Sequence, residues 1–491
     1  MKKLLTILLL FTILLTSALP AFAVGDMVTD EQATAIQNLL DNAQRTSRAP
    51  GISVAILIEG ETHFFSSGVA NLETEILADE ETLWEIASIA KSFTAVGILY
   101  LEEQGLLSLT DSIETHLPWF TLQYRGQTID MQEVRLYHFL HHTSGFTNRR
   151  HPNPLLAGSR IPDTLQDTVE VFVDANLAFM PGTQFEYGNV NYNVLGLVIE
   201  SVSGQSYEAF MEEQIFGPLG LASTFADRDA AYSTNRFAQG CRSDFVFFQR
   251  PFDSPEARGS KPTGHLISSA QDMARWMGIH LGMVVDIPEI FERIIARAHE
   301  PGQSVAEGDG TFYAAGWEVS ADRAIVEHAG NSLGFTAHVL LLPQEQIAIA
   351  VLSNIAQGNM SDVAFQISDI LSGNMQQSLG LSTIQMLDIG FSIATILGVL
   401  LAILFLILGL HRRKQSHKVP ITKKKVISRI LWDVVTTVAV FYFVPRLVLG
   451  FGTNWQFLLN LAPYSILVGL VALTLMTVSI TWFRLSKTTI K

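Results

Sequence analysis

The sequence has few of the residues on which several classes of protein depend. Its 491 residues include a single cysteine, Cys241, so no disulfide can form within the chain. Charged residues make up only 16% of the chain. Basic residues are especially scarce in residues 24–388, which carry 18 Lys and Arg against 46 Asp and Glu. This acidic excess argues against nucleic acid or an anionic surface as a partner of that part.

Charge is absent altogether from two long stretches near the C-terminus, 389–410 and 461–483. A third stretch, 429–451, contains only Arg429, Asp433 and Arg446, all near its ends. Each stretch is long enough, as a helix, to cross about 30 Å of hydrocarbon. The sequence therefore predicts three transmembrane helices within 389–491, joined to the rest of the chain by a polar linker at 373–388.

The basic residues predict how these helices are oriented. Seven Lys and Arg residues lie in 411–428 and three lie after 483, whereas 452–460 has none. Loops rich in Lys and Arg stay in the cytoplasm. Residues 1–23 combine Lys2 and Lys3 with a leucine-rich run and Ala21-Phe22-Ala23, which is typical of a secretory signal cleaved after Ala23, the alternative being an uncleaved anchor. Both features predict a multi-pass protein of the cell membrane, with everything before residue 389 outside and the C-terminus cytoplasmic.

Hydrophobic patterns in residues 24–372 predict strands at both ends and helices between them. Strands are expected at 51–58 and 63–68, and again at 313–319, 323–327, 334–342 and 347–353. A helix is expected from Ser88 to just before Gly105, and about 105–285 reads as helical fragments separated by Gly and Pro. This order predicts an α+β fold with one sheet built from both ends of the domain, an inserted helical region, and a site in the cleft between the two.

Lysine is rare in residues 24–388, where only Lys91 and Lys261 occur, and Lys91 follows Ser88 by three residues. Side chains three apart at a helix start lie on one face. A lysine whose pKa is lowered by burial can take the proton of a serine hydroxyl and so activate it as a nucleophile. The spacing predicts Ser88 as the nucleophile and Lys91 as its base, although drift toward arginine would also explain the scarcity of lysine.

A second motif is Tyr187-Gly188-Asn189, which follows a Pro-Gly turn and leads into a predicted helix. A tyrosine near Lys91 could relay the serine proton and later protonate a leaving group. Asn189 could hold a substrate amide or the lysine. The alternative is a tyrosine packed in a loop with an asparagine that fixes the turn.

A third motif, His328-Ala329-Gly330-Asn331, lies beside the late strands. Small residues on an edge strand let a substrate backbone lie alongside. The backbone N–H of Asn331 could join that of Ser88 as an oxyanion hole. His328 could bind a substrate carboxylate or hydrogen-bond Tyr187, the alternative being a structural histidine.

In this order the three motifs resemble those of the serine beta-lactamase-related hydrolases, a family that includes class C beta-lactamases, D-alanyl-D-alanine carboxypeptidases and related esterases. The stretches 140–145 (LHHTSG), 262–277 (PTGHLISSAQDMARWM), 316–317 and 330–335 are similar as well, so the resemblance covers about 30–372. It implies a beta-lactamase/transpeptidase-like α/β sandwich and an acyl-enzyme mechanism that uses no metal or organic cofactor. The site residues that it implies are Ser88, Lys91 and Tyr187 for catalysis, and Asn189, His328, Gly330 and Asn331 for the substrate.

His328 departs from the family pattern, because the beta-lactamases and most carboxypeptidases of this group carry lysine there. A histidine is only partly charged at neutral pH. We therefore expect ester or D-amino-acid substrates to be preferred over beta-lactams, with a smaller preference in acid as His328 becomes protonated. His265 stands where the family often has glycine and is expected to pack, the alternative being that it lines the pocket. His141 and His142 are expected to be structural.

These patterns predict a membrane-tethered extracytoplasmic serine hydrolase that acts on an ester or amide, with D-amino-acid compounds of the cell envelope among the candidate substrates. Three other interpretations remain open: a beta-lactamase or carboxypeptidase proper, a sensor that binds a peptidoglycan fragment or lactam and signals through the spans, and an inactive scaffold. The cytoplasmic segments are too short for an effector domain, which disfavours the sensor.

Overall fold

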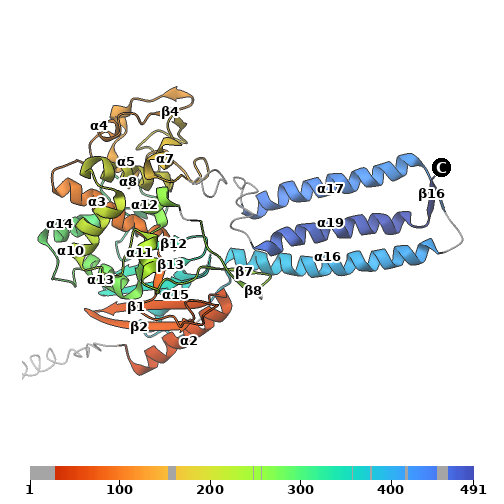
Figure 1. Ribbon diagram of the computed structural model, residues 1–491, viewed down its shortest axis with the longest axis horizontal. Helices are drawn as coiled ribbons and strands as arrows, with labels where there is room; N and C mark the ends of the chain where they lie inside the picture. The colour runs from red at the N-terminus through yellow and green to blue at the C-terminus, as the bar shows by residue number, and fades with distance from the viewer. Residues whose placement is uncertain are drawn as a thin grey trace, which may run out of the picture.

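The structure is a computed structural model, and it describes residues 28–152, 162–246, 248–255, 257–356, 358–375, 379–414, 419–449 and 463–490. The predicted signal peptide and the predicted loop at 452–460 lie outside these residues. A compact body of mixed strands and helices carries three long helices that project from one side of it (Figure 1).

A seven-stranded antiparallel sheet with the order β10-β11-β12-β13-β14-β1-β2 forms the centre of the body. Strand β1 (Gly51–Ile58) pairs along its length with both β2 (Glu61–Gly68) and β14 (Ile347–Ser353). The remaining strands are β10 (Phe312–Tyr313), β11 (Glu318–Val319), β12 (Val326–Asn331) and β13 (Thr336–Leu342). The two ends of the domain therefore build one sheet, as predicted.

Two strand predictions differ from the structure near the third motif. The stretch predicted as one strand at 313–319 is divided into β10 and β11 by a turn at Gly316, which has φ 80°. A Cβ on Gly316 would lie 2.5 Å from the Cα of Ser92, so glycine is required for this approach. Strand β12 continues to Asn331 instead of ending at residue 327, so all four residues of the third motif lie in the sheet.

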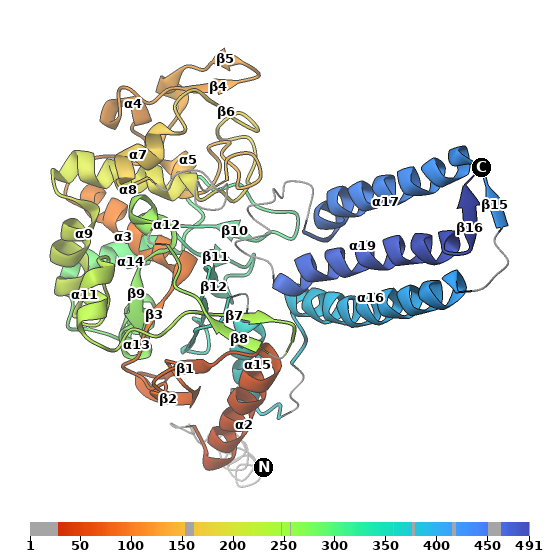
Figure 2. The ribbon, with the colours of Figure 1, turned by 45° about the vertical axis from the view of Figure 1, so that its right-hand side comes forward.

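Both faces of the sheet are covered by helices. On β1, Ile52, Val54 and Ile56 face the layer formed by α2 (Asp30–Ser47) and α15 (Met360–Leu371). Ala55 and Leu57 face the opposite layer, where α13 (Ala270–His280) packs on β1 and β14. Figure 2 shows α2 and α15 together beside the sheet. Burying each large aliphatic side chain contributes roughly 1.5–3 kcal/mol, which explains the near-continuous apolar sequence of these strands.

Helix α3 (Ala90–Glu103) crosses the core of the opposite layer, directly after the 3-10 turn η1 (Ala87–Ile89). Its residues from Ala90 to Leu99 are all buried. The ring of Phe93 stacks on that of Trp276 with centroids 4.0 Å apart. Gly105, with φ 72°, follows the helix, as predicted. A helix buried on all sides holds its first turn rigidly, and that turn carries the first motif.

The inserted region is helical, as predicted, and also contains small sheets that the sequence patterns did not indicate. The paired strands are β3 (Leu83–Glu85) with β9 (Ile267–Ser269), β4 (Leu122–Tyr124) with β5 (Gln127–Thr128) and β6 (Ala175–Asn176), and β7 (Cys241–Asp244) with β8 (Phe248–Pro251). The helices are α4 (Ile113–His116), α5 (Leu136–Leu140), α7 (Leu165–Glu170), α8 (Val190–Ser203), α9 (Tyr207–Phe210), α10 (Gly217–Leu219), α11 (Arg228–Ser233), α12 (Lys261–Gly264) and α14 (Glu289–Ala298).

The projecting helices are α16 (Thr383–Arg413), α17 (Lys423–Leu449) and α19 (Tyr464–Leu485), and all three are long and apolar enough to cross a membrane. Helix α16 begins at Thr383 rather than at 389, because Ser382 and Gln385 form a capping box that starts the helix within the predicted linker. Helices α16 and α19 pack closely, since a Cβ on Gly398 would lie 3.1 Å from Ala472. Beyond these helices, β15 (Val419–Ile421) pairs with β16 (Thr488–Ile490).

Candidate active site

Ser88 lies in η1, the sharp turn between β3 and α3. Ala87, which precedes it, has φ 48°, a left-handed conformation that costs free energy in any residue but glycine. Strand β12 presses against this turn, because a Cβ on Gly330 would lie 2.4 Å from the carbonyl oxygen of Ile86. The first and third motifs are therefore in direct backbone contact, and Gly330 is the residue that allows it.

Lys91 is fully buried and lies beside Ser88. Its Nζ lies 3.0 Å from Ser88 Oγ and donates a hydrogen bond of 2.6 Å to the carbonyl oxygen of Thr263 in α12. Burial lowers the pKa of Lys91 well below its usual range. A neutral amine keeps a lone pair, so it can accept the Ser88 proton while one of its N–H groups remains with Thr263.

Tyr187 lies against the same lysine, with Lys91 Nζ 4.9 Å from its ring centroid. Burial raises the pKa of the Tyr187 phenol, and this outweighs the contact with the Ser88 side chain, which lowers it. The Tyr187 hydroxyl oxygen is buried and completes no hydrogen bond with the described residues. The second motif thus brings a neutral phenol, with a free proton to donate, next to the serine and lysine.

Asn189 is the N-cap of α8, and its backbone N–H donates to Asn148 Oδ1 at 2.9 Å. Its own Oδ1 is buried without a partner among the described residues. The side chain of Lys91 donates to Thr263 and contacts Ser88 rather than Asn189. A contact from Asn189 to a substrate amide, which is the other role expected from the sequence, would satisfy this oxygen.

His328 is fully enclosed in the structure, and the expectation that it is partly charged at neutral pH is wrong. Its Nδ1 lies 2.7 Å from the Ala329 carbonyl oxygen and its Nε2 lies 2.9 Å from the Tyr313 hydroxyl. Nδ1 therefore donates and Nε2 accepts. Burial lowers the pKa of His328 to about 3. Its hydrogen-bond partner is Tyr313 rather than Tyr187.

Asn331 ends β12 with an unpaired backbone edge. Ser332 N–H donates to the Phe335 carbonyl oxygen at 2.9 Å, which closes the turn between β12 and β13. Because hydrogen-bonded and non-hydrogen-bonded pairs alternate in an antiparallel ladder, Gly330 bonds to β13 while the N–H of Asn331 points away from it. Strand β11 pairs only with Val326 and Glu327, so the edge at Asn331 stays open on that side.

His142 is a buried neighbour of the site that the sequence interpretation assigned only to structure. Its ring centroid lies 4.4 Å from that of Tyr187, and its Nδ1 lies 2.8 Å from Asn191 Nδ2. Burial lowers the pKa of His142 well below its usual range. Asn191 in turn accepts a hydrogen bond from Ser144 Oγ. This network supports Tyr187, and the LHHTSG stretch at 140–145 was the signal that could have indicated it.

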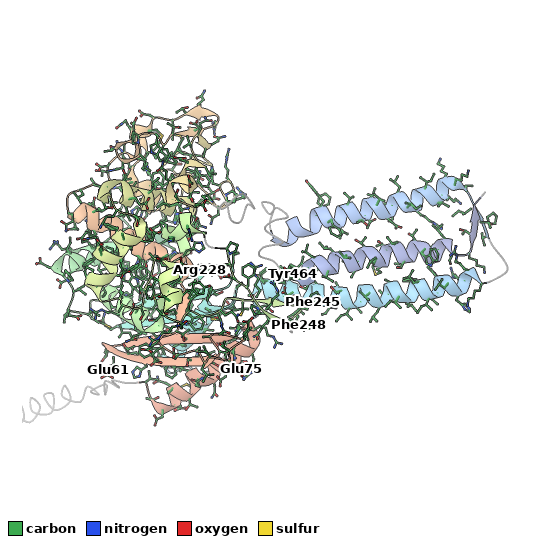
Figure 3. All side chains as sticks on the ribbon, in the orientation of Figure 1. Glu61, Glu75, Arg228, Phe245, Phe248 and Tyr464 are labelled. Carbon is green, nitrogen blue, oxygen red and sulfur yellow. The ribbon has the colours of Figure 1, made fainter. Side chains whose placement is uncertain are left out.

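His265 lines a small pocket, which is the alternative to the packing role that the sequence favoured. Its Nδ1 lies 2.9 Å from Glu85 Oε1, and Glu85 is almost fully buried in β3, just before the Ser88 turn. The same pocket is also lined by Lys261 and by Arg228, which is labelled in Figure 3. Sequence reasoning did not assign Glu85, because one acidic residue in a short strand carries no distinctive signal.

Comparisons with known proteins identify related sequences and structures of the same fold. The sequence profile of the Beta-lactamase family matches residues 36–367. Protein flp of Staphylococcus aureus (strain NCTC 8325 / PS 47) is 25% identical, and the match covers 90% of this chain and 88% of that protein. A match of that length extends beyond the family profile into the long apolar helices that follow it. A beta-lactamase of Yersinia enterocolitica is also 25% identical, over 72% of this chain and 95% of that protein.

Solved structures show the same architecture. The octameric penicillin-binding protein homologue from Pyrococcus abyssi superposes with a TM-score of 0.62 at 26% identity, over 72% of this chain and 79% of that one. The beta-lactamase/D-alanine carboxypeptidase from Pseudomonas syringae superposes with a TM-score of 0.58 at 20% identity, over 71% of this chain and all of that one. The family match spans residues 36–367, which is most of the chain, so this protein belongs to the beta-lactamase family.

Proposed function

We propose that this protein is a membrane-tethered serine hydrolase that forms an acyl-enzyme on Ser88. The observation that carries the proposal is the buried Lys91 amine, 3.0 Å from Ser88 Oγ and oriented by the Thr263 carbonyl. Desolvation of Lys91 favours its neutral form, and a neutral amine is the base that a serine nucleophile requires.

In the proposed mechanism, Lys91 takes the hydroxyl proton as Ser88 Oγ bonds to the substrate carbonyl carbon. The tetrahedral oxyanion accepts hydrogen bonds from the backbone N–H groups of Ser88 and Asn331. The phenol of Tyr187 protonates the leaving group as its bond to carbon breaks, and Tyr187 regains a proton from Lys91. Water then attacks the acyl-enzyme and gives a proton to Lys91. Lys91 returns this proton to Ser88 Oγ as the acyl group leaves.

The proposed substrates are esters or D-amino-acid amides, such as those of the cell envelope, in preference to beta-lactams. The neutral, hydrogen-bonded His328 supports this preference, because it offers no fixed positive charge to a lactam carboxylate. A beta-lactamase or D-alanine carboxypeptidase activity is the second candidate, favoured by the activities after which the similar proteins above are named. The proposed location of the domain is outside the cytoplasm, supported by the distribution of Lys and Arg around the helices.

A substrate panel tests this proposal. Specificity constants for p-nitrophenyl esters, D-alanyl amides and nitrocefin should be compared between the full-length protein and Ser88→Ala. We expect the ester or amide value to exceed the nitrocefin value, and Ser88→Ala to reduce it to background. A specificity constant for nitrocefin well above those for the esters and amides would contradict the proposed substrate preference. An active Ser88→Ala variant would contradict the proposed mechanism.

A further inference from the structure

The β7–β8 hairpin joins the body of the protein to the membrane helices. Figure 3 labels Phe245 and Phe248 of this hairpin and Tyr464 of α19, which lie together at the junction. Asp388, in the second turn of α16, accepts hydrogen bonds from the backbone N–H groups of Phe245 and Val246 at 3.0 and 2.6 Å. Ser465 Oγ of α19 donates to the same carboxylate. One buried acidic side chain therefore ties the hairpin to two helices.

The tip of the hairpin has a conformation that needs this support. Phe245 has φ 53° and Val246 has φ 65°, and left-handed backbone is unfavourable for an aromatic and especially for a β-branched residue. Conformations of this kind persist only where surrounding contacts hold them. A second contact lies beside the tip, since Tyr464 N–H donates to Asp244 Oδ1 at 2.8 Å.

The base of the hairpin holds the turn that follows β12. Arg242 Nε donates to the Leu333 carbonyl oxygen at 3.0 Å, and Cys241 N–H donates to that of Gly334 at 3.2 Å. The backbones of Gly240 and Gly334 also meet, because a Cβ on Gly334 would lie 3.0 Å from Gly240 Cα. Because the two backbones are in direct contact, the hairpin cannot move without moving the Leu333–Gly334 turn.

That turn begins directly after Asn331, whose N–H we assigned to the oxyanion hole. We propose that Asp388 is a positioning residue, which fixes Asn331 of β12 relative to Ser88 through the hairpin and so makes the acylation rate depend on contact with the membrane helices. The inference rests on the proposed function. Complete loss of one oxyanion donor costs roughly 10²–10³ in rate, so a displaced donor is expected to cost about tenfold.

Asp388→Asn in the full-length protein, reconstituted in nanodiscs, tests the inference. Its amide keeps one acceptor but loses the charge that holds two N–H groups and a hydroxyl. Reaction with a fluorophosphonate separates the maximal acylation rate from the half-saturating probe concentration. We expect the maximal rate to fall about tenfold at an unchanged half-saturating concentration, because the oxyanion forms after binding. Asp388→Glu, which restores the charge, should recover part of the rate.

Gln385→Glu is the matched control in the same helix. Gln385 Nε2 donates to the Thr46 carbonyl oxygen of α2 at 3.0 Å, so this variant weakens another joint between the body and α16. In the wild type, the backbone N–H of Ser382 donates a hydrogen bond to Gln385 Oε1, and the carboxylate of the variant can still accept this bond. We expect its acylation rate to equal that of wild type, because α2 does not hold the turn after β12.

Arg242→Lys provides a second, independent break in the same path, since it displaces the donor from Leu333. Its rate should fall, and the double variant with Asp388→Asn should be no slower than the slower single variant, because both act through one element. The inference would be overturned if the acylation rate were unchanged in both single variants, or if the two losses in rate were additive in the double variant. An equal loss of rate in Gln385→Glu would also overturn it. If the wild-type protein is not acylated at all, the proposed function fails instead.

Discussion

Replacing Lys91 by methionine should stabilise the protein while removing its activity. The variant keeps an unbranched apolar stem and deletes a fully buried amine. Each unit by which burial lowers the pKa of Lys91 costs the folded state about 1.4 kcal/mol, because the unfolded chain holds that proton freely. The loss of the hydrogen bond to Thr263 costs about 1–3 kcal/mol. Because burial lowers the pKa of Lys91 well below its usual range, we expect this cost to outweigh the lost hydrogen bond and the melting temperature of the variant to rise.

The sign of the pH dependence follows from proton linkage. Between the lowered pKa of folded Lys91 and the usual lysine pKa of about 10.4, the unfolded chain binds a proton that the folded protein does not. The stability of the wild type therefore rises with pH across this window. The gain in stability of Lys91→Met over the wild type should be largest at the low-pH end of this window and should disappear as the pH approaches 10.

Thermal unfolding of the purified full-length protein at pH 6, 8 and 10 measures this effect. Lys261→Met is the matched control, because Lys261 forms an ion pair with Glu208 at 2.6 Å and its loss should lower the melting temperature. Acylation of Lys91→Met should fall roughly 10²–10⁴-fold, the usual contribution of a general base. A Lys91→Met variant that is less stable than wild type at pH 6, or that remains active, would refute a neutral, catalytic Lys91.

Three further predictions concern the other motifs and the membrane helices. The ratio of ester to nitrocefin specificity constants should stay constant from pH 5.5 to 8, because His328, with a pKa of about 3, remains neutral throughout; a ratio that falls in acid would contradict this. Tyr187→Phe should slow acylation by a hundredfold or more in stopped-flow assays. Tyr313→Phe, which removes the donor to His328, should slow it less, and an equal loss in both variants would contradict a direct role for the Tyr187 phenol. A cysteine at Ser416, with the buried Cys241 replaced by serine, should resist an impermeant thiol reagent in intact cells, and ready labelling there would reverse the topology.

The sequence was sufficient for the features that depend on local pattern. Short apolar runs indicated β1 and β14 with the bounds that the structure has, and the charge-free stretches indicated α16 and α19. The three motifs were assigned from spacing and resemblance, and the structure brings Ser88, Lys91 and Tyr187 together.

What the sequence could not provide depends on contacts between distant segments. The lysine partner Thr263 is 172 residues from Lys91, and no pattern links them. The charge state of His328 was misjudged because burial and the Tyr313 hydrogen bond, rather than residue type, set its pKa. The helical start of α16 was missed for a different reason, since a capping box in a polar stretch gives a weaker signal than an apolar run.

The most direct test of the account is to locate the covalent adduct that a fluorophosphonate forms with the full-length protein. Mass spectrometry of the digested protein should place the adduct on the peptide that contains Ser88, and Ser88→Ala should remove it without lowering the melting temperature. An adduct on another residue, or none on protein that is demonstrably folded, would contradict the assignment of Ser88 as the nucleophile.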